Sequence, residues 1–392
     1  MTRNGPCNSG RTIWLMAFAA GAVVANNYYN QPLLQEMSES LDISAQAASW
    51  IASITQIGYA LGLLLLLPLG DRLDRRHMIT VLMFLSALML VLFSLSNSYP
   101  SVLASGFLIG LTSIVPQMLP PIASQSVPAN EAADAVGKVM AGLLLGIVLS
   151  RFVGGWLGDL LGWRAVYGLA AGLMLILMVV LRKSLSPVAP TFRGSYYQLI
   201  LSLKHIYMRH ATLRTISLAA ALQFGAFSLF WTTLAFHLNA MPEHYSAKVA
   251  GTFALIGATG VLGALVSGKF TKRYSERLVL IISGSLMLAA FAMFFLAQDT
   301  LVWLIPAVIL LDLGMQMSHV TSMSTILFLD RNSTNRLNTT YMVIRFLGGA
   351  VGTIVGGYSW HHGGWITVCA AGFSFCLIAL LINAYGSTSA DA

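Results

Sequence analysis

The stretch Gly154-Gly155-Trp156, followed at a fixed distance by Gly162-Trp163, recurs 202 residues later as Gly356-Gly357-Tyr358 and Gly364-Trp365. A second pair of segments matches at almost the same spacing, because Leu-Pro-Leu-Gly-Asp-Arg-Leu-Asp-Arg-Arg at 67–76 aligns with Gly-Lys-Phe-Thr-Lys-Arg-Tyr-Ser-Glu-Arg at 268–277. Two matches at one spacing in a chain of 392 residues indicate that a half-chain has been duplicated. The duplication predicts two domains of similar structure.

The composition places both halves in a membrane. Hydrophobic residues make up 57% of the chain and charged residues only 9%, whereas a soluble domain carries roughly 25% charged residues. Twelve apolar stretches reach the roughly 20 residues that a membrane-spanning helix needs. They lie at about 12–36, 46–69, 77–97, 99–123, 136–159, 163–182, 213–238, 247–269, 277–297, 300–328, 338–360 and 365–386. We therefore expect an all-α membrane protein with two six-helix bundles, an arrangement typical of secondary transporters.

The 22 Lys and Arg residues predict the orientation in the membrane. With the N-terminus inside, only Arg164 and Lys248 lie outside, Arg151 and Arg345 lie within helices, and the rest are cytoplasmic. Both termini are therefore expected in the cytoplasm, and the formal net charge of +8 reflects topology rather than nucleic-acid binding. The first apolar run is too long for a cleavable signal. We expect a multi-pass protein of the inner membrane, with no disulfide framework among its 3 cysteines.

The longest connection divides the chain into three parts. Residues 1–182 are expected to form the N-terminal bundle, 183–212 a cytoplasmic linker, and 213–392 the C-terminal bundle. Within the linker, residues 196–210 have the pattern of an amphipathic helix. Such a helix is expected to lie on the inner membrane surface.

The loop after the stretch at 46–69 carries the sharpest local motif, Pro68-Leu69-Gly70-Asp71-Arg72 followed by Arg75-Arg76. It resembles the signature loop between the second and third helices of the major facilitator superfamily, which reads Gly-x-Leu-Ala-Asp-Arg-x-Gly-Arg-Arg. The chain departs from this signature at Leu67 and Asp74, which replace the two glycines. The resemblance covers the whole chain in length, helix count, repeat and charge pattern, and it implies the fold of that superfamily.

The charges of this loop predict a conformational latch. Asp71 can pair with the basic side chains around it and cap the start of a neighbouring helix, holding the two halves in one state. The alternative is that the arginines are only anchors on the cytoplasmic side, but this does not account for the acid among them. The proposed latch consists of Asp71, Arg72, Arg75 and Arg76.

Small residues recur at every fourth position in the stretches at 136–159 and 338–360. Such ridges allow two helix backbones to approach closely. The predicted packing positions are Gly146, Gly154, Gly155, Gly352 and Gly356.

Two family motifs are altered in this chain. The fifth helix of antiporters in the superfamily carries Gly-Pro two residues before Gly-Gly, and Ser150-Arg151 stands at that Gly-Pro position here. The arginine usual in the fourth helix is replaced by Gly106. The chain is nevertheless similar to the bacterial drug:proton antiporter and sugar-efflux branch of the superfamily.

Ionisable residues are expected to meet at mid-membrane. At 1.5 Å per residue, Arg151 and Asp312 both lie roughly 20–24 Å from the cytoplasmic ends of their helices. An unpaired ion at that depth costs at least ~2.5 kcal/mol, so mutual proximity is expected. Asp312 is then the predicted proton carrier, Arg151 the charge that tunes it, and His319 a second candidate. The alternatives are a permanent ion pair for Asp312 and a simple hydrogen bond for His319.

Further polar residues are predicted to line a substrate cavity. In the superfamily every third helix, beginning with the first, lines this cavity. The candidates are Asn26, Asn27, Tyr28, Asn30, Gln56, Gln117, Gln223, Trp231, Gln316 and Arg345. Arg345 either snorkels to the interface or lines the inner vestibule, and Gln117, Gln223 or Trp231 could instead only pack. Gln31-Pro32 is expected to interrupt the first helix.

Together these patterns predict a secondary active transporter that exports a small organic molecule by alternating access, powered by the proton gradient. The alternative is a uniporter or a proton symporter of an organic anion or sugar, with Arg151 binding the substrate charge. An enzyme is not expected, because the sequence has no nucleophile–base constellation, HExxH motif or phosphate-binding loop. The expected partners are the substrate, protons and lipids, with no cofactor, metal or nucleic acid, and the protein is expected to be a monomer.

Overall fold

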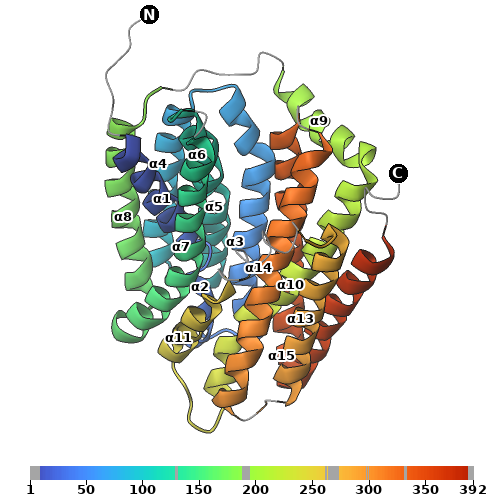
Figure 1. Cartoon of the computed structure of the whole chain (residues 1–392). Helices are drawn as coiled ribbons and strands as arrows, with labels where there is room; N and C mark the ends of the chain where they lie inside the picture. The colour runs from blue at the N-terminus through green and yellow to red at the C-terminus, as the bar shows by residue number, and fades with distance from the viewer. Residues whose placement is uncertain are drawn as a thin grey trace, which may run out of the picture.

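The computed structural model describes residues 9–128, 131–187, 195–260, 263, 273–296, 298, 300–330 and 333–386. The regular structure of this part is helical (Figure 1), as expected. The first half contains α1 (Ser9–Ala25), α2 (Asn30–Ser40), α3 (Ala45–Leu65), η1 (Leu67–Asp71), α4 (Arg75–Ser94), α5 (Tyr99–Thr112), α6 (Val115–Gln125), α7 (Ala132–Leu161) and α8 (Trp163–Ser184). After α9 (Tyr196–Arg209) come α10 (Ala211–Ala240), α11 (Ala247–Gly257), α13 (Glu276–Leu296), α14 (Leu301–Leu329) and α15 (Thr334–Tyr385).

These elements correspond to the predicted spans. In the described part of the chain, 9 helices are long and apolar enough to cross a membrane. The first predicted span is divided into α1 and α2, and the fourth into α5 and α6. α15 combines the last two spans, with a non-helical kink at Gly363 and Gly364. The eighth span begins as α11, and most of its second half lies outside the described residues.

The duplicated Gly-Trp pairs form equivalent turns in the two halves. Gly162, with φ +81°, ends α7, and Gly364, with φ +61°, lies in the kink of α15. Both need the left-handed conformation that glycine adopts without strain. The tryptophans that follow are buried, Trp163 donating to Ser40 and Trp365 to the backbone of Phe294. The repeat therefore encodes a tight helix–helix turn twice.

The break in the first span lies one turn earlier than predicted. Residues Asn26–Tyr29 interrupt the helix, whereas Gln31 and Pro32 are the second and third residues of α2. The prediction placed the interruption at the proline itself. Proline is tolerated in the first turn of a helix, while its ring clashes with the carbonyl four positions earlier. The helix therefore breaks before Pro32 rather than at it.

The apolar face of the linker helix α9 packs on the protein. The side chains of Leu199, Leu203 and Ile206 are buried. Tyr196 donates a hydrogen bond to the carbonyl of Leu65 in α3, at 2.6 Å. The sequence pattern shows the apolar face of α9 but not what covers that face. Below, the end of the molecule that carries α9, where α1 begins and α15 ends, is called the α9 end (Figure 1).

The glycine ridges pack the same way in both halves. A Cβ atom on Gly146 of α7 would overlap the backbone of Gly21 in α1, and one on Gly352 of α15 would overlap that of Gly225 in α10. Gly155 and Gly357, each one residue beyond a ridge glycine, face the opposite half instead. A Cβ on Gly155 would approach the Cα of Gly251 in α11 to 2.9 Å, and one on Gly357 would overlap Ser49 in α3. These two contacts join the halves at the end opposite α9.

Gly352→Ala is expected to lower the free energy of unfolding by about 1–3 kcal/mol, the usual cost of overpacking. The added methyl group would overlap the carbonyl oxygen of Gly225, and backbone cannot give way as a side chain does. Gly172→Ala is the control, since nothing lies within 4 Å of a Cβ there. Thermal unfolding of both purified variants measures the difference. Equal midpoints would contradict the close packing of α10 and α15.

Candidate substrate cavity and its closing layer

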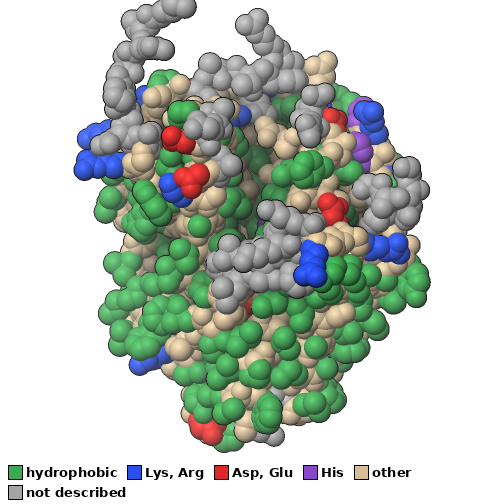
Figure 2. Space-filling view, in the orientation of Figure 1, with side chains coloured by type: hydrophobic (Ala, Val, Ile, Leu, Met, Phe, Trp, Pro, Cys, Tyr) green, Lys and Arg blue, Asp and Glu red, His purple; other side chains and the backbone are tan. Residues whose placement is uncertain are grey.

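A cavity of about 490 Å³ lies between the two halves and opens at the α9 end. Its mouth includes Ser124 near the end of α6 and Thr334 and Asn335 at the start of α15. Figure 2 shows the surface hollowed between the halves at this end. The volume is within the range of roughly 300–1,000 Å³ that holds drug-sized molecules.

Apolar and polar side chains both line the cavity, and α14 and α15 supply residues of both kinds. The apolar wall includes Met140, Leu143, Leu144 and Ile147 of α7, Met315 and Met323 of α14, and Met342 and Phe346 of α15. The polar side chains include Tyr28, Tyr59, Gln117, Gln316, His319, Asn338 and Arg345. None of the described residues that line the cavity is acidic.

A buried layer lies one turn deeper than this lining. Gln31, Arg151, Trp231 and Asp312 lie three or four positions beyond the lining residues Tyr28, Ile147, Phe227 and Gln316. All four side chains are at most 3% exposed. We call these four residues the closing layer, because they lie beyond the innermost lining of the cavity.

Arg151 is held by aromatic rings from both halves. The carbon at the centre of its guanidinium lies 5.1 Å from the ring of Tyr28, 5.3 Å from that of Phe227 and 4.4 Å from that of Trp231. Its Nε donates to Oε1 of Gln31 at 2.6 Å, and one Nη has no hydrogen-bond partner. Cation–π contacts of this kind are stronger when desolvated. Arg151 therefore connects the first half to α10 of the second half.

Asp312 lies on the other side of the closing layer, against α11. A Cβ on Gly257 would come within 3.0 Å of a carboxylate oxygen of Asp312, so only glycine leaves room for the acid there. Its Oδ2 atom is buried without a hydrogen-bond partner. Arg151 is the charged residue whose field acts on Asp312, but among the described residues no ion pair within 4.0 Å joins the two. In this state the charges of Asp312 and Arg151 interact without direct contact.

Arg345 lines the cavity in this state, which is one of the two placements left open by the sequence. Its guanidinium carbon lies 4.0 Å from the ring of Phe224, and its Nε is buried without an acceptor. His319 also lines the cavity and shares a hydrogen bond of 3.1 Å with the hydroxyl of Tyr341. Both side chains are therefore available to a molecule in the cavity.

Sequence comparison supports the fold in which this cavity occurs. The sequence model described as the Major Facilitator Superfamily matches residues 14–353. The chain belongs to this superfamily. It is 36% identical over 382 residues to the uncharacterized transporter YgaY of Escherichia coli O157:H7, covering 97% of both chains. It is 25% identical to the inner membrane transport protein YnfM of E. coli K12, covering 95% of this chain and 89% of the relative.

Solved structures of the superfamily have the same fold. A bacterial homologue of the human lysosomal transporter Spinster, in an inward-facing and unoccupied conformation, superposes with a TM-score of 0.76 at 14% identity, covering 97% of both chains. A mutant of the nucleoside transporter NupG superposes with a TM-score of 0.81 at 13% identity, covering 96% of this chain and 99% of that one. The chain is thus a multi-pass membrane transporter of the superfamily, with its two-bundle all-α fold.

Several residues predicted to line the cavity are directed elsewhere. Asn26 donates to the hydroxyls of Ser86 and Ser113 inside the first bundle, and Gln223 accepts from Ser318 inside the second. Asn27, Asn30 and Trp231 are buried but do not line the cavity either. The prediction was wrong for these residues in this state, because the depth of a residue does not fix the direction of its side chain.

Gln56 joins the two halves instead of facing the cavity. Its Nε2 donates to the hydroxyl of Thr353 in α15 at 3.2 Å, and Thr232 of α10 donates to the same hydroxyl at 3.3 Å. Tyr28, Gln117, Gln316 and Arg345 do line the cavity, as placed by the sequence.

Two residues of the site were missed from the sequence. Gln31 was noted only for its place beside a proline, yet it accepts the hydrogen bond from Arg151. Thr353 lies 202 residues after Arg151, the spacing of the repeat, so aligning the halves would have found it.

The structure describes most of the basic loop at 67–76, which carries the proposed latch. Arg75 is buried and donates from Nε to the carbonyl of Gly70 at 3.0 Å. Arg76 donates to the last-turn carbonyl of Arg182 in α8 at 2.8 Å, while Arg72 is exposed. The side chain of Asp71 lies outside the described residues. Asp74, which replaces a family glycine, caps α4 by accepting from the backbone of Arg76.

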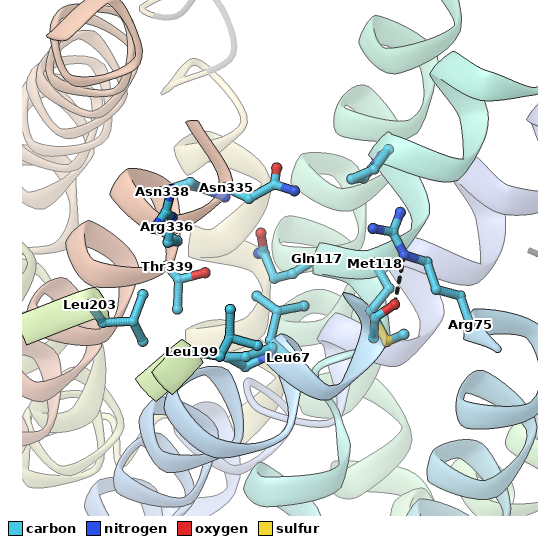
Figure 3. A pocket seen from close by; sticks show the side chains of 13 residues that line it. Leu67, Arg75, Gln117, Met118, Leu199, Leu203, Asn335, Arg336, Asn338 and Thr339 are labelled. Carbon is cyan, nitrogen blue, oxygen red and sulfur yellow. Dashed lines mark hydrogen bonds between the residues drawn. The ribbon is translucent and has the colours of Figure 1, made fainter. Parts of the chain in front are cut away.

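A small recess separates this loop from the second half (Figure 3). Arg75 and Gln117 of the first half lie across it from Asn335, Arg336 and Thr339 at the start of α15. Leu199 and Leu203 of α9 also line it. The loop is therefore placed where the halves would meet if the α9 end closed.

Asp71→Asn is expected to slow transport several-fold and leave substrate affinity nearly unchanged. The substitution removes a charge from the loop but does not alter the cavity. Transport rate and equilibrium binding, measured on the same preparation, separate the two effects. An unchanged rate would count against the latch.

Proposed function

We propose that this transporter exports a small organic molecule from the cytoplasm by alternating access, and that inward movement of protons drives the export. The supporting observation is Asp312, the single buried acid among the described residues, which lies beyond the inner end of a cavity between two halves of a duplicated chain. The α9 end is taken as cytoplasmic, as the distribution of Lys and Arg predicts.

Asp312 is suited to exchange a proton between conformations. Burial favours the neutral form of a carboxyl group, and a nearby cation favours the ionised form. Arg151 belongs to α7 of the first half and Asp312 to α14 of the second half. A rocking motion of the halves would change their separation and hence the proton affinity of the acid. Binding and release of the proton would then follow the conformational change.

The contacts between the halves favour such a motion. The α9 end is open, and the opposite end is closed by two symmetric contacts, Gly155 with Gly251 and Gly357 with Ser49. Transporters built from repeats move one half against the other around a central site. Opening the closed end would require both of these close contacts between the halves to separate.

Reconstituted vesicles test proton coupling directly. The purified protein is inserted into liposomes that contain a pH-sensitive dye, and candidate amphiphiles, sugars and amino acids are added without a proton gradient. A coupled substrate would change the pH inside the liposomes only when the protein is present. A proton ionophore, which lets protons equilibrate across the membrane, would abolish that pH change. Substrate movement with no proton movement would overturn the proposal.

Arg345 favours a second candidate, a uniporter or a proton symporter of an organic anion. Its guanidinium lies in the cavity without an ion pair among the described residues. The same vesicles distinguish the candidates. A uniporter moves substrate without protons, a symporter moves both in the same direction, and the proposed exporter moves them in opposite directions.

A further inference from the structure

The buried interior carries more positive than negative charge. Among the described residues, Arg151 and Arg345 are buried cations at or beside the cavity, and Asp312 is the single buried acid there. Arg151 lies within the field of Asp312, whereas Arg345 has no acid of its own. A buried cation without a counter-charge is unfavourable and is usually paired. The missing negative charge can be supplied by a bound molecule.

Several side chains that can donate hydrogen bonds line the same cavity as Arg345. The side chains of Gln316, His319 and Asn338 line the same cavity, and each can donate a hydrogen bond. Tyr28 and Tyr59 also line it. Because none of the described lining residues is acidic, no carboxylate among them competes for the guanidinium.

The guanidinium is held in place without being neutralised. It lies 4.0 Å from the ring of Phe224 and 5.9 Å from that of Phe346, and its Nε atom is buried without an acceptor. The two rings hold the guanidinium in place, and none of the described residues accepts a hydrogen bond from it. A planar donor edge of this kind matches a carboxylate.

The rest of the cavity suits an apolar body. Four apolar side chains of α7 and the methionines of α14 and α15 form the wall, and methionine adapts to ligands of different shape. We infer, on the basis of the proposed function, that the substrates are amphiphilic organic anions, with the negative group held by Arg345 and the apolar body against this wall. The inside-negative membrane potential would also favour the outward movement of such an anion.

Matched probes of one skeleton test the charge selectivity of the wild-type protein. Phenylbutyrate and naphthylacetate are compared with their uncharged amides and with trimethylammonium analogues, by calorimetry and thermal stabilisation of the full-length protein in detergent. We expect the carboxylates to bind at least about tenfold more tightly than the amides, the effect of one charged hydrogen bond. Carboxylates that fail to bind, or amides and ammonium compounds that bind as well, would overturn the inference.

Substitutions assign the selectivity to Arg345. Arg345→Gln is expected to remove the preference for carboxylate over amide while keeping amide affinity, and Arg345→Lys to retain part of it. Lys138→Gln is the matched control, since it removes a cation paired with Asp134 that does not line the cavity. If Arg345→Gln does not fold, Arg345→Lys and the probe series on the wild-type protein still test whether the site selects carboxylates. A carboxylate preference retained in Arg345→Gln would contradict the role of this residue.

The two proposals can fail separately. Proton movement without carboxylate selectivity refutes only the inference about Arg345. Carboxylate selectivity with uncoupled transport refutes only the proton-coupled function.

Discussion

Asp312→Asn is expected to abolish proton-driven transport and to leave substrate binding or exchange measurable. Asparagine has nearly the shape of aspartic acid, so it fits against Gly257 as the carboxyl group does. It cannot take up or release a proton in this pH range. In vesicles with an imposed proton gradient, accumulation of substrate should fall to the level of protein-free vesicles. Exchange of labelled for unlabelled substrate should continue, because exchange needs no net proton movement.

Asp159→Asn provides the control for the loss of an acid. Asp159 lies near the end of α7 with an exposed side chain, away from the cavity and its closing layer. Its substitution should leave coupled transport unchanged. If Asp312→Asn still concentrates substrate with the wild-type dependence on pH, another group carries the proton and the assignment is wrong.

Arg151→Ala is expected to remove transport or shift its pH optimum, through two effects. It removes the charge that acts on Asp312, and it removes the stacking that connects α7 to Trp231 of α10. A desolvated cation–π contact contributes about 2 kcal/mol or more, so losing it changes the balance of open and closed states by more than tenfold. The closed end should open more often. Spin-label distances across that end measure this shift.

Arg151→Lys separates the two effects, because lysine keeps the charge but loses the planar stacking and the hydrogen bond from Nε to Gln31. The pH dependence of transport should therefore change less in Arg151→Lys than the fraction of molecules in which the end opposite α9 is closed. Arg164→Gln, at the same end and in contact with Ser96 and Trp163 of its own half, is the charge control. Wild-type activity in Arg151→Ala would show that neither effect operates.

Much of the fold could be predicted because it depends on local rules. Length and hydropathy predict the spans, since a helix must satisfy its own backbone in lipid. The repeat predicts the two halves, and Gly162 and Gly364 require turns wherever the chain goes next. The positions of helix breaks were predicted less accurately. Pro32 was expected to interrupt the helix at its own position, but the interruption lies about one turn before it, and Pro32 is in the first turn of α2.

The candidate site was predicted less completely. Counting residues from a helix end gives the depth of a residue in the membrane. By this count Arg151 and Asp312 were predicted to lie at similar depth, and in the structure they are near enough for their charges to interact. Depth does not give direction around the helix axis. Asn26 and Tyr28 are two positions apart beside a helix break, yet Asn26 bonds to Ser86 in its own bundle and Tyr28 faces the cavity.

The sequence by itself determined that the chain is a duplicated, membrane-spanning bundle with a few ionisable residues at mid-membrane, because hydrophobicity, helix rise and repeat spacing are properties of the chain. The tertiary structure decided which of those residues meet. Arg151 contacts Trp231, 80 positions away, and Gln56 contacts Thr353 in the other half. Such contacts follow from the packing of one helix face on another, where glycines allow close approach and buried polar groups form hydrogen bonds. No local sequence pattern specifies which faces pack together.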